Sequence, residues 1–208
     1  MSFLRVLSGV GLLIAGARAI HEGTSRQRDE VPGSLPGGAG MNASLQGVRS
    51  LDDRMRILVR LIREGRVDPV VREWSAKVLA RRCGDDWCVR EKDRANEIKA
   101  IFDALRRQVR YTGDTWSNDT FSAARHTLRL GIGDCDDSVI TGCSALETVG
   151  IRTRCVVIQT VDGADWDHIY LEADDGAGGW VPFDASVPKP CGWAAPASMV
   201  KRRRVFST

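Results

Sequence analysis

The residues best suited to chemistry in this sequence follow a short glycine turn, where Cys135 stands at the predicted start of a helix. Asp134 is a good N-cap residue, and an apolar run with helical spacing continues to Gly150, where a glycine typically ends a helix. The positive end of the helix dipole and the unpaired backbone N–H groups favour a thiolate, the nucleophilic form of cysteine. The alternative interpretation is one more small buried cysteine.

Three aspartates crowd this cysteine: Asp134, Asp136 and Asp137. Nearby negative charge raises the pKa of a thiol and therefore opposes the helix dipole. The carboxylates would not raise the pKa of Cys135 in this way if they pointed to solvent or bound a basic substrate. They are the least explained part of the pattern.

Downstream of the cysteine helix, the hydrophobic period changes from helical to two. Segments 153–160, 166–173 and 179–184 are strand-like, and residues 174–178 have the composition of a hairpin loop. Helices followed by consecutive antiparallel strands indicate the α+β class, with the cysteine-bearing helix packed on an antiparallel sheet.

A candidate partner pair for the cysteine comes from this hairpin. If it is centred on Gly176, His168 pairs with Asp184 and Tyr170 with Pro182. Proline has no N–H, so both pairs are of the non-hydrogen-bonded kind, with Cα atoms about 4.5 Å apart. The carboxylate could then accept a proton from the imidazole and orient it as a base for a nucleophile. An ordinary cross-strand pair, worth up to about 1 kcal/mol, is the alternative.

Three amphipathic helices precede the cysteine, and we expect them to form the core and to carry no chemistry. The first runs from a Ser50 cap to Gly65, the second begins after an Asp68 cap, and the third runs from about residue 88 to 109.

The ends of the chain differ in composition from this domain, which we predict over residues 50–200. Residues 1–20 are apolar and too short for a stable membrane anchor. Their composition is typical either of a cleaved signal peptide or of a helix that docks on a larger assembly or membrane surface. Residues 21–49 are a glycine- and proline-rich linker, and residues 201–208 a solvated basic tail.

Composition excludes several classes of protein. With 43% apolar and 27% charged residues and a net charge of +3, the 208-residue chain is ordinary for a soluble globular protein. No nucleic-acid-binding motif accompanies the basic run, so no specific nucleic-acid binding is expected. Cys83 and Cys88 could form a local disulfide, half of a metal site, or a simple helix–helix turn, which we prefer. No Cys/His pair at zinc-like spacing completes a metal site, and no metal or other cofactor is expected.

The order of motifs resembles the transglutaminase-like superfamily, over about residues 127–186. Four segments carry the resemblance: 133–137 (GDCDD), 150–154 (GIRTR), 167–172 (DHIYLE) and 179–184 (GWVPFD). The GDCDD form is similar to small bacterial and phage-encoded members. The resemblance implies a papain-like cysteine-peptidase fold with Cys135 as nucleophile, His168 as base and Asp184 as orienting group.

One segment departs from the family pattern. In the loop 111–126 no residue aligns with the family's side-chain oxyanion donor. We expect the Cys135 backbone N–H to be one donor from its geometry. Trp116 or Tyr111 is our prediction for the second.

These observations predict a thiol-dependent acyl-transfer enzyme acting on a protein or peptide, without a cofactor. Water as acceptor makes it a cysteine peptidase or amidase, which we favour, and an amine acceptor makes it a cross-linking transglutaminase. The rival is a phage or bacterial assembly protein, for example of a virion, that uses the same fold as a binding module. A cytoplasmic or virion-associated location is expected, with export by a cleaved signal as the alternative.

Overall fold

The structure, a computed structural model, describes residues 42–45, 50–113, 120–163 and 165–208. Its helices are α2 (Leu51–Gly65), α3 (Pro69–Leu79), α4 (Arg94–Gln108), α5 (Ala124–Leu130) and α6 (Cys135–Glu147), with the 3₁₀ turn η1 (Ala197–Met199). The strands are β1 (Asn42–Ser44), β2 (Arg82–Cys83), β3 (Asp86–Trp87), β4 (Arg110–Tyr111), β5 (Thr120–Ser122), β6 (Ile132–Gly133), β7 (Thr153–Gln159), β8 (His168–Asp174), β9 (Trp180–Phe183) and β10 (Arg202–Ser207). The predicted α+β class is confirmed.

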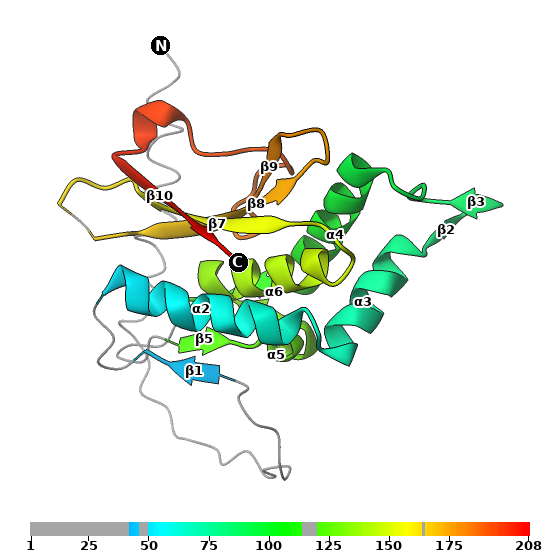
Figure 1. Cartoon of the computed structure of the whole chain (residues 1–208), viewed down its shortest axis with the longest axis horizontal. Helices are drawn as coiled ribbons and strands as arrows, with labels where there is room; N and C mark the ends of the chain where they lie inside the picture. The colour runs from blue at the N-terminus through cyan, green and yellow to red at the C-terminus, as the bar shows by residue number, and fades with distance from the viewer. Residues whose placement is uncertain (1–41, 46–49, 114–119, 164) are drawn as a thin grey trace, which may run out of the picture. The chain divides into compact units, whose positions relative to one another are not determined.

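The main sheet has four antiparallel strands in the order β10-β7-β8-β9. Helix α6 packs on this sheet through β7 and β8, and α2 packs on the other side of α6 (Figure 1). The cysteine-bearing helix therefore packs on the antiparallel sheet, as the sequence predicted, and it lies between that sheet and α2.

The helix starts follow the predicted caps. Ser50 Oγ accepts a hydrogen bond from the Asp53 backbone N–H at 3.1 Å, and Asp68 Oδ1 accepts one from Val70 at 2.8 Å. The third helix begins at Arg94, later than predicted: Lys92 has a positive φ of 61°, which a helix does not allow, and Asp93 supplies the cap.

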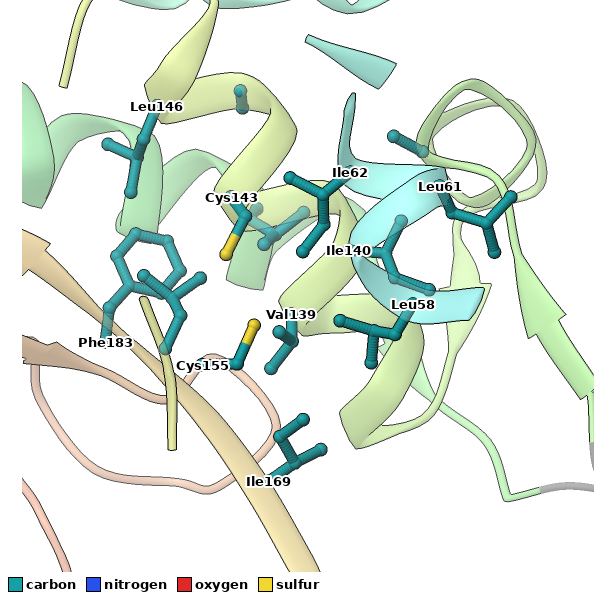
Figure 2. Packing of buried hydrophobic residues seen from close by; sticks show 14 of the residues in the cluster. Leu58, Leu61, Ile62, Val139, Ile140, Cys143, Leu146, Cys155, Ile169 and Phe183 are labelled. Atoms are coloured by element: carbon teal, nitrogen blue, oxygen red, sulfur yellow. The ribbon is translucent and has the colours of Figure 1, made fainter. Parts of the chain in front are cut away.

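The core lies where α2, α6 and the sheet meet. Figure 2 shows Leu58 and Ile62 of α2 facing Ile140 of α6, and Phe183 of β9 on the other side of the helix. Phe183 also packs edge-to-face on Phe102 of α4, with ring centroids 5.0 Å apart. The opposite face of the sheet carries a smaller cluster of Val156, Ile158 and Tyr170, covered by Ala194, Ala195 and Val200.

Gly65 sets how closely α2 approaches α6. A Cβ at this position would lie 2.8 Å from Ser144 Cβ and 3.3 Å from Ala124 Cβ. Both are atoms next to backbone, which cannot yield without moving a helix. We expect Gly65→Ala to lower the free energy of unfolding by about 1–3 kcal/mol, measured by urea unfolding. Gly113→Ala is the matched control, because no atom of the described residues lies within 4 Å of the added methyl group there; equal losses in the two variants would contradict this explanation.

Two segments that were expected to be a linker and a tail contain strands. Residues 202–207 are exposed for the most part but are not a tail: they form the edge strand β10, which pairs with β7 along its whole length. Within the expected linker, Asn42–Ser44 form β1 and pair with β5. The remainder of that linker, and the apolar segment 1–20, lie outside the described residues. Among the helices described, none has the length and apolar character needed to cross a bilayer.

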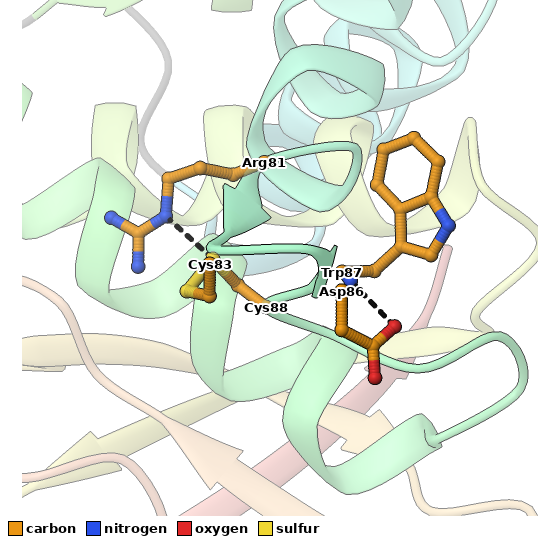
Figure 3. Close-up of a disulfide and its surroundings, with 5 residues drawn as sticks. All are labelled: Arg81, Cys83, Asp86, Trp87 and Cys88. Carbon is orange, nitrogen blue, oxygen red and sulfur yellow. Dashed lines mark hydrogen bonds between the residues drawn. A yellow bond between two sulfur atoms is a disulfide. The ribbon is translucent and has the colours of Figure 1, made fainter.

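Cys83 and Cys88 form a disulfide across the β2–β3 hairpin (Figure 3). Of the three alternatives for this pair, the structure contains the local disulfide, so our preference for a simple turn was wrong. The bond closes the connection between α3 and α4.

Candidate functional site

Cys135 is the first residue of α6, and its position is fixed by the residues around it. Asp134 Oδ1 caps the helix by accepting the Asp137 backbone N–H at 3.1 Å, and Asp137 Oδ1 accepts the Ser122 backbone N–H at 2.7 Å. Gly133 passes so close to this turn that an added Cβ would lie 2.8 Å from Asp137 Cβ. Two of the three crowding aspartates thus anchor the helix start, and the glycine before them is required by packing.

His168 and Asp184 form the second part of the site. His168 Nε2 lies 2.7 Å from Asp184 Oδ2, and the side chains are only 14% and 5% exposed. The other carboxylate oxygen, Oδ1, accepts the Ser186 hydroxyl at 2.7 Å and its backbone N–H at 3.2 Å. Because Asp184 holds Nε2, the nitrogen left for proton exchange on this ring is Nδ1.

The predicted contact between His168 and Asp184 is present, but the register behind it was wrong. Pro182 lies opposite Glu172 and not opposite Tyr170, so β9 is shifted by two residues along β8 relative to the predicted register. Asp184 therefore reaches His168 along the diagonal of the hairpin. An offset of two residues keeps every side chain on its predicted face, which is why the contact survives.

Cys135 connects to this pair through the backbone of β8. The backbone N–H of Ile169, the residue after His168, is directed to the Cys135 sulfur and lowers its pKa. Burial has the largest effect and, with the charges of Asp136, Asp134 and Asp184, raises the pKa of Cys135 well above its ordinary value. These effects oppose the preference for a thiolate that the helix dipole gives, and they favour the neutral thiol.

The pKa of His168 is shifted in the direction opposite to the one that burial alone would give. Burial lowers the pKa of His168, but the hydrogen bond and charge of Asp184, with the charges of Asp136 and Asp167, outweigh it and raise that pKa. Burial likewise opposes the charge on Asp184, yet its contacts to His168 and Ser186 keep its pKa below the ordinary value. An imidazole with a raised pKa is suited to accept a proton during attack by a nucleophile.

The two predicted oxyanion residues differ in what can be said of them. Tyr111 lies in β4, pairs with Gly133, and is 46% exposed, so its backbone runs beside the approach to Cys135. Trp116 lies outside the described residues. Both stay predictions.

Asp134, Cys135 and Asp136 each offer a ligand atom within 4.8 Å of the others, so the distances alone would allow a metal ion. We assign none, because the Asp134 carboxylate is already committed to capping the helix.

The sequence pattern missed Ser186, which braces Asp184. A signal was present, since aspartate two residues before serine is typical of a turn in which the side chain bonds the backbone. The anchoring roles of Gly133 and Asp137 were missed because the aspartate was treated only as charge.

The family model described as the transglutaminase-like superfamily matches residues 81–185, a range that includes all three candidate catalytic residues. A search of curated proteins gives no significant match.

Two solved structures are similar to this chain, and both are named only provisionally as proteases. The first, a cysteine protease from Cytophaga hutchinsonii, is 18% identical with a TM-score of 0.43, over 80% of this chain and 58% of that one. The second, a protease from Parabacteroides distasonis, is 10% identical with a TM-score of 0.42, over 64% of this chain and 26% of that one. The chain thus spans less than two thirds of either protein.

Proposed function

This chain belongs to the transglutaminase-like superfamily, and on that premise we propose that it is a thiol-dependent acyl-transfer enzyme acting on peptide or amide bonds. Cys135 is the nucleophile, His168 the base and then the acid, and Asp184 the residue that orients the imidazole. The observation that carries the proposal is the His168–Asp184 contact, which commits Nε2 and leaves Nδ1 for the thiol proton.

In the first half-reaction, the Cys135 sulfur attacks the substrate carbonyl carbon while its proton passes to His168 Nδ1. The tetrahedral intermediate carries negative charge on the former carbonyl oxygen, which the Cys135 backbone N–H at the helix start is suited to bind. The imidazolium then gives its proton to the leaving amine, the C–N bond breaks, and a thioester remains on Cys135.

In the second half-reaction, an acceptor resolves the thioester. His168 takes a proton from the acceptor as it attacks, and the sulfur leaves with that proton returned to it. Water gives a carboxylic acid and a peptidase or amidase, whereas a primary amine gives a new amide and a transglutaminase. We propose hydrolysis as the main reaction. No step requires a cofactor.

Site-resolved alkylation tests the nucleophile, because the chain supplies its own internal controls. Iodoacetamide near neutral pH is followed by peptide mass spectrometry at the four free cysteines. Cys143 and Cys155 are fully buried. Cys191 is partly buried, as Cys135 is, and burial raises the pKa of both thiols, that of Cys191 to about 11. The proposed difference between these two is that His168 acts as a base for Cys135. We expect Cys135 to react first, and its rate to fall in His168→Ala because the base is gone.

The acceptor is identified in a separate assay with the same protein. A panel of fluorogenic amides reports hydrolysis, and a glutamine-containing peptide with a fluorescent primary amine reports transfer. If Cys135 reacts no faster than Cys143 and no amide is turned over, the enzyme proposal fails, and the fold serves as a binding module.

A further inference from the structure

A groove away from the catalytic residues runs between α3 and α4, with a volume of about 390 Å³. Its floor is apolar, formed by side chains such as Val78, Ala100 and Ala104. Four cationic residues line the groove: Lys77, Arg81, Lys99 and Arg107. Asp103 is the one acidic residue among the lining residues. A cationic rim over an apolar floor fits a ligand that carries both carboxylates and an apolar group.

The cations are not equally available to a ligand. Lys77 pairs with Glu73 at 2.7 Å, and Lys99 pairs with Asp103 at 2.6 Å. Among the described residues, neither Arg81 nor Arg107 has a carboxylate at ion-pair distance, although both line the groove. Guanidinium groups bind carboxylates in a bidentate geometry, which makes these two arginines the strongest contacts the groove offers.

The disulfide hairpin fixes one end of the groove. Cys88 lines it, and Arg81 Nε donates to Cys88 Sγ at 3.3 Å (Figure 3). That contact uses one N–H of the guanidinium and leaves its two terminal nitrogens for a ligand. The bond between Cys83 and Cys88 thus holds Arg81 in place at the groove's edge.

The length of the groove sets the size of its ligand. The lining follows α4 from Asn96 to Arg107, a span of about 16 Å at 1.5 Å per residue. An extended peptide rises about 3.3 Å per residue, so about five residues fill this length. Single-stranded nucleic acid fits less well, because Trp74 is the one aromatic side chain among the lining residues and successive bases would have no row of rings to stack on.

We propose that this groove is a docking site for an acidic peptide segment of a partner protein, about five residues long, with an apolar side chain on the floor and carboxylates on Arg81 and Arg107. The site is independent of the acyl-transfer chemistry, so it stands whether or not the chain is an enzyme.

Fluorescence anisotropy with the full-length chain tests the docking site. The probe is a fluorescein-labelled peptide of about five residues made of glutamate and leucine, and its neutral analogue carries glutamine in place of glutamate. We expect the acidic probe to bind and the neutral analogue to bind at least about tenfold more weakly, with affinity falling as salt rises. Cys135→Ala is expected to bind the probe unchanged.

The variants localise the binding. Arg81→Glu with Arg107→Glu is expected to weaken binding by about tenfold or more. Arg72→Glu with Arg129→Glu changes the net charge equally on exposed residues that do not line the groove, and is expected to have less than about a twofold effect. Thermal unfolding of both double variants checks that the fold is intact.

Three results would overturn the proposal. One is equal binding of the acidic and neutral probes, and another is equal loss in the two double variants. The third is tighter binding of a single-stranded oligonucleotide or of vesicles containing phosphatidylserine, if the groove variant abolishes it, since the ligand would then be of another class.

Discussion

Replacing Cys135 by alanine is expected to lower kcat/KM for amide or peptide turnover by at least about three orders of magnitude. The sulfur is the atom that forms the covalent intermediate, and no other described thiol can take its place. Cys143 and Cys155 are fully buried, between α6 and the sheet, as Figure 2 shows. What remains in the variant is binding and oxyanion stabilisation of direct attack by water.

The same substitution should leave the fold intact. Alanine is a good helix former at the first turn, and the cap from Asp134 to Asp137 does not involve the sulfur. The thermal midpoint of Cys135→Ala is therefore expected to stay near that of the parent protein. Loss of activity with an unchanged midpoint separates a chemical role from a structural one.

Cys191→Ala is the matched control for this experiment. Cys191 is the other free, partly buried thiol, and burial raises its pKa to about 11. Its removal should change kcat/KM by less than about twofold, since it lies outside the proposed machinery. If turnover survives in Cys135→Ala but is lost in Cys191→Ala, the nucleophile is Cys191, and the proposal for Cys135 is refuted.

Features that depend on neighbours in the sequence could be predicted well. The Ser50 and Asp68 caps and the cysteine at the start of α6 each follow from a few consecutive residues. The faces of the hairpin were also predictable, because alternation fixes which side chains share a side. Those faces were enough to bring His168 and Asp184 together.

The hairpin register could not be predicted, because side-chain contacts within the loop decide it. Asp175 Oδ1 accepts the backbone N–H groups of Ala177 and Gly179, both within 2.9 Å, and this folds the turn around Ala177 and not around Gly176. Loop composition shows that a turn exists but not which of several glycines lies at its centre.

Strand β10 was missed for a different reason: its partners are far away in the sequence. Arg203 bonds Glu172 at 2.9 Å, Arg204 bonds Asp52 at 2.8 Å, and the Arg202 guanidinium lies 4.4 Å from the Trp166 ring centroid. A run of like charges read by itself indicates a solvated segment. Only tertiary structure brings each arginine its partner.

Asp184→Asn is expected to lower kcat/KM by about two to four orders of magnitude above neutral pH. The amide can still occupy the position beside His168 Nε2, but it carries no charge to stabilise an imidazolium. The variant tests the orienting role directly, because the size of the side chain is preserved. Its more informative result is the shape of the pH profile.

The sign of the pH effect follows from the folded-state pKa values. The pKa of His168 is raised because the bond and charge of Asp184 outweigh burial, so the base is neutral, and the enzyme active, only above that raised value. The pKa of Asp184 is lowered, so Asp184 loses its proton at a lower pH than His168 does and stays charged across the acid limb of the kcat/KM profile. Without the carboxylate, burial lowers the pKa of His168, and the acid limb of kcat/KM moves to lower pH.

The ratio of parent to variant kcat/KM should therefore be smallest in acid and rise with pH until the parent imidazole is fully neutral. Asp174→Asn is the control: it removes a buried, ion-paired carboxylate from the far end of the same strand and should leave the limb in place. A limb that moves to higher pH in Asp184→Asn would instead indicate a preformed thiolate–imidazolium pair, since loss of the carboxylate would destabilise the charged imidazole that such a pair needs. That outcome would contradict the neutral resting thiol inferred from the burial of Cys135 and its surrounding aspartates.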